Sequence, residues 1–227
     1  MKRIWNYFSP TERGLWAASV ILVTASFVLF DRSNVFTLIT SLIGVTSLIF
    51  LAKGNPVGQV LMILFSLLYG IISYSFAYYG EMITYLGMTM PMAVVALIAW
   101  LRHPYKGNHA QVEIDRISRR EIGFLCVLTA GVTLLFYFIL AYFKTANLAV
   151  STLSVTTSFA AVYLTFRRSP YYALLYAAND LVLVILWVWA TLRDRSYLSV
   201  TVCFAVFFAN DLYGFLNWRR MEKRQQA

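Results

Sequence analysis

Residues 171–192 read YYALLYAANDLVLVILWVWATL, and this stretch contains a single charged side chain, that of Asp180. An α-helix needs roughly 20 apolar residues to cross the roughly 30 Å of hydrocarbon in a bilayer. A strand of a membrane β-barrel would instead show about ten residues of alternating character. The stretch therefore predicts a transmembrane α-helix with one carboxylate near its middle.

The composition of the whole chain agrees with this interpretation. Of 227 residues, 60% are hydrophobic and 13% are charged, whereas a soluble domain carries roughly 45–50% apolar and roughly 25% charged residues. Because water cannot solvate so much apolar surface on a chain of this size, we expect an all-α membrane protein with about eight transmembrane helices. The expected spans are residues 14–30, 35–52, 56–79, 82–101, 123–143, 148–166, 171–192 and 197–218.

Basic residues are distributed unevenly between the two sides that alternating spans would create. Of the 19 Lys and Arg residues, 15 fall on one side and 4 on the other. The smaller group consists of Arg32, Lys144, Arg193 and Arg195. Since loops rich in Lys and Arg stay in the cytoplasm, we expect a multi-pass protein of the plasma (inner) membrane with both termini cytoplasmic. The net charge of +9 is then a topology signal and does not indicate nucleic-acid binding.

Two segments share one pattern, which suggests an internal repeat. In residues 35–101 and 148–218 the first helix carries small or hydroxyl side chains, and a basic residue and a proline precede the second helix. One span separates the segments, so both have the same orientation, as in transporters with parallel repeats. The expected bundle has one N-terminal helix followed by a 3+1+3 parallel repeat. Its parts are an N-terminal cytoplasmic segment and first helix (1–34), the first repeat (35–101), a cytoplasmic loop and linker helix (102–147), the second repeat (148–218) and a basic cytoplasmic tail (219–227).

Two carboxylates lie well inside predicted spans. Asp180 and Asp211 occur in the same tetrapeptide, Ala-Asn-Asp-Leu, at residues 178–181 and 209–212 on neighbouring helices. A carboxylate at the centre of a bilayer costs roughly 2.5–3.5 kcal/mol even on insertion scales, so it must face the bundle interior, a partner or water. The repeated tetrapeptide therefore predicts a polar site between the seventh and eighth spans.

Helical spacing adds amides and aromatic rings to this polar site. The predicted substrate-binding residues are Tyr176, Asn179, Asp180, Asn210, Tyr213, Asp211, Gln59, Tyr69 and Trp187. Aromatic faces and a carboxylate both stabilise an organic cation, and amides bind sugar hydroxyls, so the set suits a sugar-bearing heteroaromatic molecule. Two alternatives stay open: such polar groups often only join membrane helices, and Asp211 is close enough to the helix end to meet Arg219 or Arg220.

Other residues argue against an enzyme. The sequence has no P-loop, GxSxG or HExxH motif, and its two cysteines and two histidines lack metal-ligand spacing. We therefore expect no catalytic residue, no metal and no cofactor. Trp5, Trp16, Trp100 and Trp218 are expected to anchor the protein at the membrane interface, and Pro91 is expected to loosen the fourth span.

Several short motifs resemble a known family. Tyr79-Gly80-Glu81-Met82 and Met90-Pro91-Met92 in the first repeat, and Asn210-Asp211-Leu212-Tyr213-Gly214 at the end of the second, resemble the PnuC family of nicotinamide riboside transporters. The resemblance covers roughly residues 35–225. It implies a bundle related to the SWEET sugar transporters, which moves nicotinamide riboside by facilitated diffusion while a cytoplasmic kinase traps the product.

The resemblance also implies site residues. In the family a Trp and an Asn four residues later bind substrate on the middle helix of the second repeat, and these positions are Tyr176 and Asp180 here. The first repeat has Ala93 and Val94 where the family has Gln or Asn. A carboxylate at position 180 favours a cation such as the pyridinium of nicotinamide riboside, or thiamine, or coupling to a proton.

We therefore carry three hypotheses. The first is a uniporter for nicotinamide riboside or a related nucleoside-like vitamin precursor. The second is a proton-coupled transporter of another small vitamin or nucleoside, such as thiamine or a deoxynucleoside. The third is a membrane scaffold subunit without a substrate. The sequence leaves open whether the chain forms a homo-oligomer.

Overall fold

The computed structural model describes residues 7–32, 34–75, 78–145 and 147–227. Lys2, Arg3 and Trp5, which entered the charge and anchor predictions, lie outside these ranges. Within them, eight helical segments are long and apolar enough to cross a membrane. The helices are α2 (Pro10–Phe30), α3 (Val35–Ala52), α4 (Val57–Ser75), α5 (Tyr79–Thr84), α6 (Met90–Arg102), α7 (Arg119–Tyr142), α8 (Leu148–Phe166), α9 (Tyr171–Thr191) and α10 (Leu198–Gln226).

Polar side chains fix several helix starts. Ser9 and Glu12 form a capping box at α2, in which each side chain bonds the other residue's backbone N–H, and Pro10 follows at the first helical position. Asn34 accepts from the backbone N–H of Thr37 at the start of α3. These caps satisfy backbone donors that would otherwise be exposed to lipid headgroups or buried without a partner.

The fourth span is not a uniform α-helix. A π-helical turn, Tyr85–Thr89, joins α5 to α6 just before Pro91. Proline lacks an N–H and its ring clashes with the carbonyl of the preceding turn, so a widened turn accommodates it. The expected weak point therefore takes the form of a π-turn.

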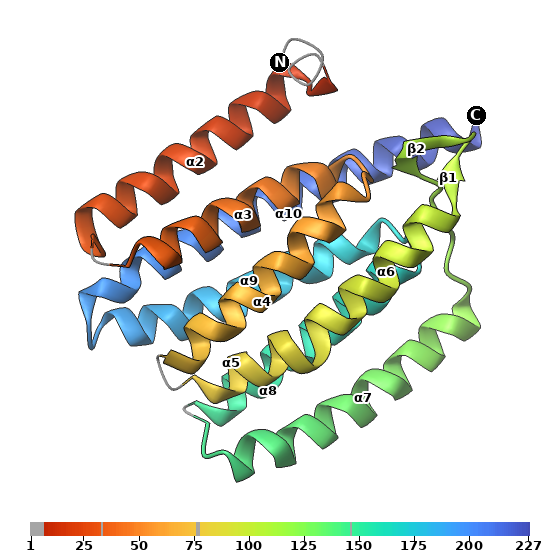
Figure 1. Ribbon diagram of the computed structural model, residues 1–227. Helices are drawn as coiled ribbons and strands as arrows, with labels where there is room; N and C mark the ends of the chain where they lie inside the picture. Colours follow the sequence, from red (N-terminus) through yellow and green to blue (C-terminus); the bar gives the residue numbers. More distant parts are fainter. Residues whose placement is uncertain (1–6, 33, 76–77, 146) are drawn as a thin grey trace.

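Six helices form a closed ring. Contacts run from α3 to α4, then to α6, α8, α9, α10 and back to α3. Helix α2 packs outside the ring against α3 and α10, and α7 packs against α8 on the opposite side (Figure 1). In this ring each three-helix unit meets the other twice, third helix against first helix, which is the contact pattern that a parallel repeat would produce.

The connection between α6 and α7 contains a β-hairpin that the sequence did not predict. Strands β1 (Pro104–Tyr105) and β2 (Asn108–Val112) pair antiparallel, and they lie beside the C-terminal end of α10 (Figure 1). The N–H of Val112 donates to the carbonyl of Gly54 at 2.9 Å. The Gln225 amide donates to the carbonyl of Val112 at 3.1 Å, so α10 continues past its expected end at residue 218 to support the hairpin. We call this the hairpin end of the bundle, and the opposite one the far end.

Burial separates the ring from the two outer helices. Half or more of the most apolar window is buried in α3 (56%) and in α10 (56%), but only 22% in α2 and 17% in α7. The exposed side chains of α7 are large and apolar, for example those of Val127 and Phe138. A contiguous apolar surface of this kind suits lipid as the surrounding solvent. The ring therefore encloses the interior in which polar residues gather.

Candidate functional site

Asp180 and Asp211 meet in the interior of the ring. Asp180 lies on α9 and Asp211 on the adjacent α10, and the two carboxyl groups interact with one another. They are only 4% and 5% exposed. In the part of the chain that the structure describes, neither forms a salt bridge, and Arg219 pairs with Glu222.

Several buried polar atoms on the ring helices have no partner. Among the described residues, Oδ2 of Asp180, Nε2 of Gln59 and Oγ of Ser66 are buried without a hydrogen bond. Gln59 and Ser66 are seven residues apart on α4, and therefore on one face of it. A buried polar atom left unpaired costs roughly 1–3 kcal/mol. Water or a polar ligand would remove this cost.

An aromatic layer covers the site toward the far end. Trp187 of α9 donates its indole N–H to the hydroxyl of Tyr69 on α4 at 3.1 Å. The Tyr69 ring lies 4.4 Å from that of Tyr85 and 5.6 Å from that of Phe204, measured between centroids. We call this set, with Phe65 and Phe207, the far-end layer. It connects the two three-helix units above Asp180.

A second aromatic layer covers the site toward the hairpin end. Trp218 and Tyr172 both donate to the carbonyl of Leu51, at 2.8 and 3.2 Å. Trp100 donates to the carbonyl of Thr165 at 2.9 Å, and its ring lies 5.4 Å from Trp218. We call Trp100, Tyr172 and Trp218 the hairpin-end layer. These bonds also join one unit to the other, so the site is closed at both ends.

A small cavity lies beside the far-end layer. A cavity between α3, α4 and α10, lined by Ser41, Tyr69 and Cys203 among others, has a volume of about 10 Å³. That is enough for about one water molecule. Gly44 of α3 fits here only because it lacks a side chain, since a Cβ would lie 2.4 Å from Cζ of Phe207. Because hydrogen bonds join the two units in both aromatic layers, we call this form of the bundle occluded.

Comparison with known proteins identifies the family to which this bundle belongs. The family described as "Nicotinamide mononucleotide transporter" matches residues 34–220. The chain belongs to that family of membrane transporters.

A similar curated protein is the nicotinamide riboside transporter PnuC of Neisseria mucosa, 22% identical over 98% of this chain and 85% of that protein. A similar solved structure is described as the crystal structure of the vitamin B3 transporter PnuC. It superposes with a TM-score of 0.84 at 20% identity and covers 96% of this chain and 94% of that one. The eight-helix membrane fold expected from the sequence is thereby confirmed.

The transporter places only some of the predicted residues beside the Asp180–Asp211 pair. Tyr176 is within electrostatic range of both carboxyl groups, and Tyr172, which was not predicted, is in range of Asp211. Tyr69 and Trp187 lie in the far-end layer, bonded to each other. The alternative left open for Asp211, an ion pair with Arg219 or Arg220, does not form in the described part of the chain, where Arg219 pairs with Glu222.

Three predicted residues face neighbouring helices. Asn179 accepts from Ser154 at 3.1 Å and Thr157 at 2.9 Å, both on α8. Asn210 donates to Ser19 of α2 at 2.9 Å. Tyr213 donates to Glu12 of α2 at 3.3 Å. In the occluded transporter these side chains join helices, which is the alternative that the sequence had left open.

The tryptophan prediction was wrong at two positions. Trp100 and Trp218 are 1% and 0% exposed and form the hairpin-end layer, so they do not anchor the protein at the membrane surface. A Trp within two residues of an Arg at the end of an apolar run is typical of an interface anchor, and only the packing of the two units reveals the other role. Trp16 remains at the edge of the bundle, where its indole N–H donates to Thr46 at 3.3 Å.

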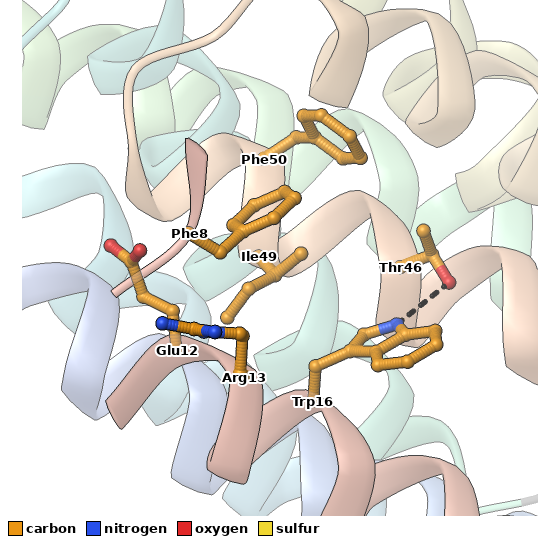
Figure 2. Close-up of a pocket in the computed structure, with 7 residues that line it drawn as sticks. All are labelled: Phe8, Glu12, Arg13, Trp16, Thr46, Ile49 and Phe50. Atoms are coloured by element: carbon orange, nitrogen blue, oxygen red, sulfur yellow. Dashed lines mark hydrogen bonds between the residues drawn. The ribbon is translucent and has the colours of Figure 1, made fainter. Parts of the chain in front are cut away.

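A groove beside Trp16 lies apart from the carboxylate pair. Figure 2 shows its lining, with Phe8 and Phe50 on one side and Glu12, Arg13 and Trp16 on another. Its volume is about 220 Å³. Glu12 is engaged by Lys53 at 3.1 Å. The groove therefore belongs to the attachment of α2 to α3 and does not extend the central site.

Sequence reasoning also missed Glu81. Glu81 was not among the predicted site residues, yet it lies in the first turn of α5 and is 2% exposed. The neighbouring Gly80 approaches the end of α7 and the segment after it, where a Cβ would lie 2.6 Å from the Thr145 methyl. A glycine next to an acid at the start of an apolar run was the available signal.

Proposed function

We propose that the transporter takes up nicotinamide riboside or a closely related nucleoside-like vitamin precursor. The supporting observation is the buried Asp180–Asp211 pair, which no described Lys or Arg neutralises. Nicotinamide riboside carries a pyridinium cation and ribose hydroxyls, which match a carboxylate, aromatic rings and unpaired polar atoms. The name of the Neisseria relative, a nicotinamide riboside transporter, supports the same substrate.

In this proposal Tyr176 and Asp180 are the primary contacts. Asp180 balances the pyridinium charge, and Tyr176, one turn away on the same face of α9, offers its ring to the heterocycle. Gln59 and Asp211 form hydrogen bonds with the ribose hydroxyls. Asn179, Asn210 and Tyr213 remain predicted contacts that would require their bonds to α8 and α2 to break.

Transport would occur by facilitated diffusion. The two three-helix units, residues 35–101 and 148–218, would rock against each other around the carboxylate pair and separate one aromatic layer at a time. Opening the far-end layer requires loss of the Trp187–Tyr69 bond, and opening the hairpin-end layer requires loss of the bonds to Leu51. A cytoplasmic kinase would trap the riboside by phosphorylation, and the fold would share its repeat plan with SWEET transporters.

The orientation in this proposal follows the distribution of basic residues. Lys53, Arg167, Arg168 and the tail beyond Trp218 are at the hairpin end, whereas Arg32, Lys144, Arg193 and Arg195 are at the far end. The positive-inside rule places the hairpin end in the cytoplasm. Both termini would then be cytoplasmic and the membrane would be the plasma (inner) membrane.

A ligand panel tests the substrate. Purified transporter is heated with nicotinamide riboside, nicotinic acid riboside, uridine or thiamine, and the melting temperature is measured. Because a ligand that binds only the folded state stabilises it, nicotinamide riboside should raise the melting temperature most. A larger rise with thiamine would identify thiamine as the better substrate. No rise with any of the four ligands would support the scaffold hypothesis.

Proton coupling is the second candidate, and the interaction between two buried carboxyl groups favours it. Two neighbouring carboxyl groups in a buried site resist double ionisation, so a substrate cation that binds there would exchange with a proton. The test uses vesicles that contain no kinase. A uniporter should only equilibrate the substrate, whereas a coupled transporter should accumulate it until the proton gradient is collapsed.

A further inference from the structure

Glu81 is a buried carboxylate that the central site does not use. It lies near the far end of the bundle and is 2% exposed. Among the described residues its Oε2 has no hydrogen-bond partner, and Glu81 forms no salt bridge. A buried carboxylate in this condition is expensive to maintain, because its lost hydration is not replaced. A bound cation or a proton on the carboxylate would offset this cost.

The surroundings of Glu81 favour an organic cation. Tyr85 of the following π-turn lies four residues after Glu81, and therefore on the same face of the span. The Tyr69 ring of α4 lies 4.4 Å from that of Tyr85. A carboxylate on the same face as aromatic rings, with no salt bridge among the described residues, attracts a positively charged heterocycle.

Glu81 is also continuous with the central site. Tyr85 follows Glu81 by one helical turn, about 6 Å along the axis, and it is in range of both Glu81 and Asp180. The Tyr69 ring, 4.4 Å from that of Tyr85, bonds Trp187 on α9. Trp187 lies seven residues, or about 10 Å, from Asp180 toward the far end. The far-end layer thus lies between two buried carboxylates, Glu81 and Asp180.

The backbone near Glu81 contains a turn that could change the position of Tyr85 relative to Glu81. The π-turn Tyr85–Thr89 begins four residues after Glu81, and such turns often occur at functional sites because they redirect side chains. Gly70 of α4 allows the turn to approach closely, since a Cβ there would lie 2.5 Å from Cγ of Leu86. A change in this turn would move Tyr85 relative to Glu81 while α4 remains in place.

We propose that Glu81, with the rings of Tyr69 and Tyr85, forms a far-end subsite for the cationic ring of the substrate. It receives the cation first and passes it to Asp180 when the far-end layer opens. This inference rests on the proposed function. It assigns the transporter a preference for the positively charged form of its substrate, selected before the central site is reached.

The experiment compares a cation with a neutral analogue of the same shape. Nicotinamide riboside is positively charged, and its reduced dihydropyridine form is neutral. Uptake of both is measured for wild type, Glu81→Gln and the matched control Glu113→Gln, whose side chain is exposed in the loop at the hairpin end. Since an interaction with a charged group is worth roughly tenfold or more in binding, Glu81→Gln should raise KM for the cation about tenfold and leave the neutral analogue unchanged.

Two results distinguish the inference from the proposed function. If wild type does not transport the riboside at all, the proposed function fails. If wild type transports the riboside, the ratio of KM for the cation to KM for the neutral form is compared between the two proteins. An equal ratio in Glu81→Gln and in wild type would overturn the far-end subsite while the proposed function stands. The Glu81→Asp variant, which keeps the charge, should retain the preference for the cation.

A measurement on wild type covers the case in which Glu81→Gln does not fold. A hydrophobic carbodiimide modifies buried carboxyl groups, and mass spectrometry reports the modification at Glu81. A saturating concentration of the cationic riboside should protect Glu81, and the neutral form should not. Equal labelling with and without the cation would overturn the subsite.

Discussion

The two three-helix units have the same order of helices but carry different chemistry. In the second unit, α9 and α10 are continuous and bring Asp180 and Asp211 together at mid-depth. In the first unit, the third span is interrupted by a π-turn, and its one buried acid, among the described residues, is Glu81 near the far end. The comparison shows that continuous helices hold the central carboxylate pair and that the interrupted span places its acid near one end.

The largest expected effect is the removal of the charge held by the second unit. Asp180→Ala should lower uptake of nicotinamide riboside by at least about 100-fold, because breaking a buried ionic contact costs roughly 3–5 kcal/mol. Uptake into proteoliposomes measures it. The control Asp194→Asn alters an exposed carboxylate at the far end and should transport normally. Normal uptake by folded Asp180→Ala would remove Asp180 from the site.

The next effect concerns the close contact between the units. Gly44→Ala places a Cβ 2.4 Å from Cζ of Phe207 and 2.9 Å from the ring of Phe65. Overpacking costs roughly 1–3 kcal/mol and outweighs the gain of up to about 1 kcal/mol in helix propensity. Thermal unfolding should therefore show a lower melting temperature than wild type.

Gly131→Ala is the matched control for this contact. Gly131 lies on α7 and has nothing within 4 Å of the added Cβ, so its replacement should keep or raise the melting temperature. Equal stabilisation by both replacements would mean that the units are not packed closely at Gly44.

A smaller effect is expected at the far-end layer. The Trp187–Tyr69 bond joins the second unit to the first, and a hydrogen bond contributes roughly 0.5–1.5 kcal/mol to stability. Trp187→Phe and Tyr69→Phe should therefore be non-additive by about that amount in a double-mutant cycle of chemical unfolding. Additive effects would show that the bond does not hold the layer closed.

The smallest effect belongs to the ion pairs that fasten the second unit to the linker helix. Arg167 contacts Asp115 at 3.1 Å and also bonds Glu121. Partly exposed pairs contribute roughly 0–1 kcal/mol, so Arg167→Gln should lower the free energy of unfolding by less than about 1 kcal/mol. Arg224→Gln, an exposed change in the tail of α10, should have no effect.

The effect of Arg167 should not depend on pH near neutrality. Its hydrogen bond to Glu121 raises the pKa of the Arg167 guanidinium from an already high value. A group with a raised pKa contributes its stability below the ordinary pKa and loses it only as the pH rises through the raised one. The stability difference between wild type and Arg167→Gln should therefore be constant from roughly pH 6 to pH 9. A slope in that range would implicate another titrating group.

Sequence periodicity predicted the fold well because lipid imposes simple rules. Each span must be a long apolar helix, and the predicted limits of α3 and α8 agree with the structure to the residue. The β-hairpin was missed because Pro104–Val112 is a short polar segment whose strands depend on contacts with Gly54 and Gln225. No local pattern encodes those partners.

The site was predicted only in part, for a related reason. Charge in an apolar run identifies Asp180 and Asp211, since such residues must face the interior. Helical spacing gives a face, but not which neighbour that face meets. Asn179 faces α8, Asn210 faces α2, and Trp218 lies in the interior. Each of these positions depends on how the helices pack around the ring, which the sequence of one helix does not show.

The central claim is that the Asp180–Asp211 pair binds the substrate cation, and calorimetry tests it without requiring any movement of the aromatic layers. Nicotinamide riboside is titrated into purified wild type and into Asp180→Ala, which removes the carboxylate and leaves no amide in its place. Wild type should bind with measurable heat, and folded Asp180→Ala should bind at least about 100-fold more weakly. Equal affinity in the two proteins would contradict the account and place the substrate elsewhere.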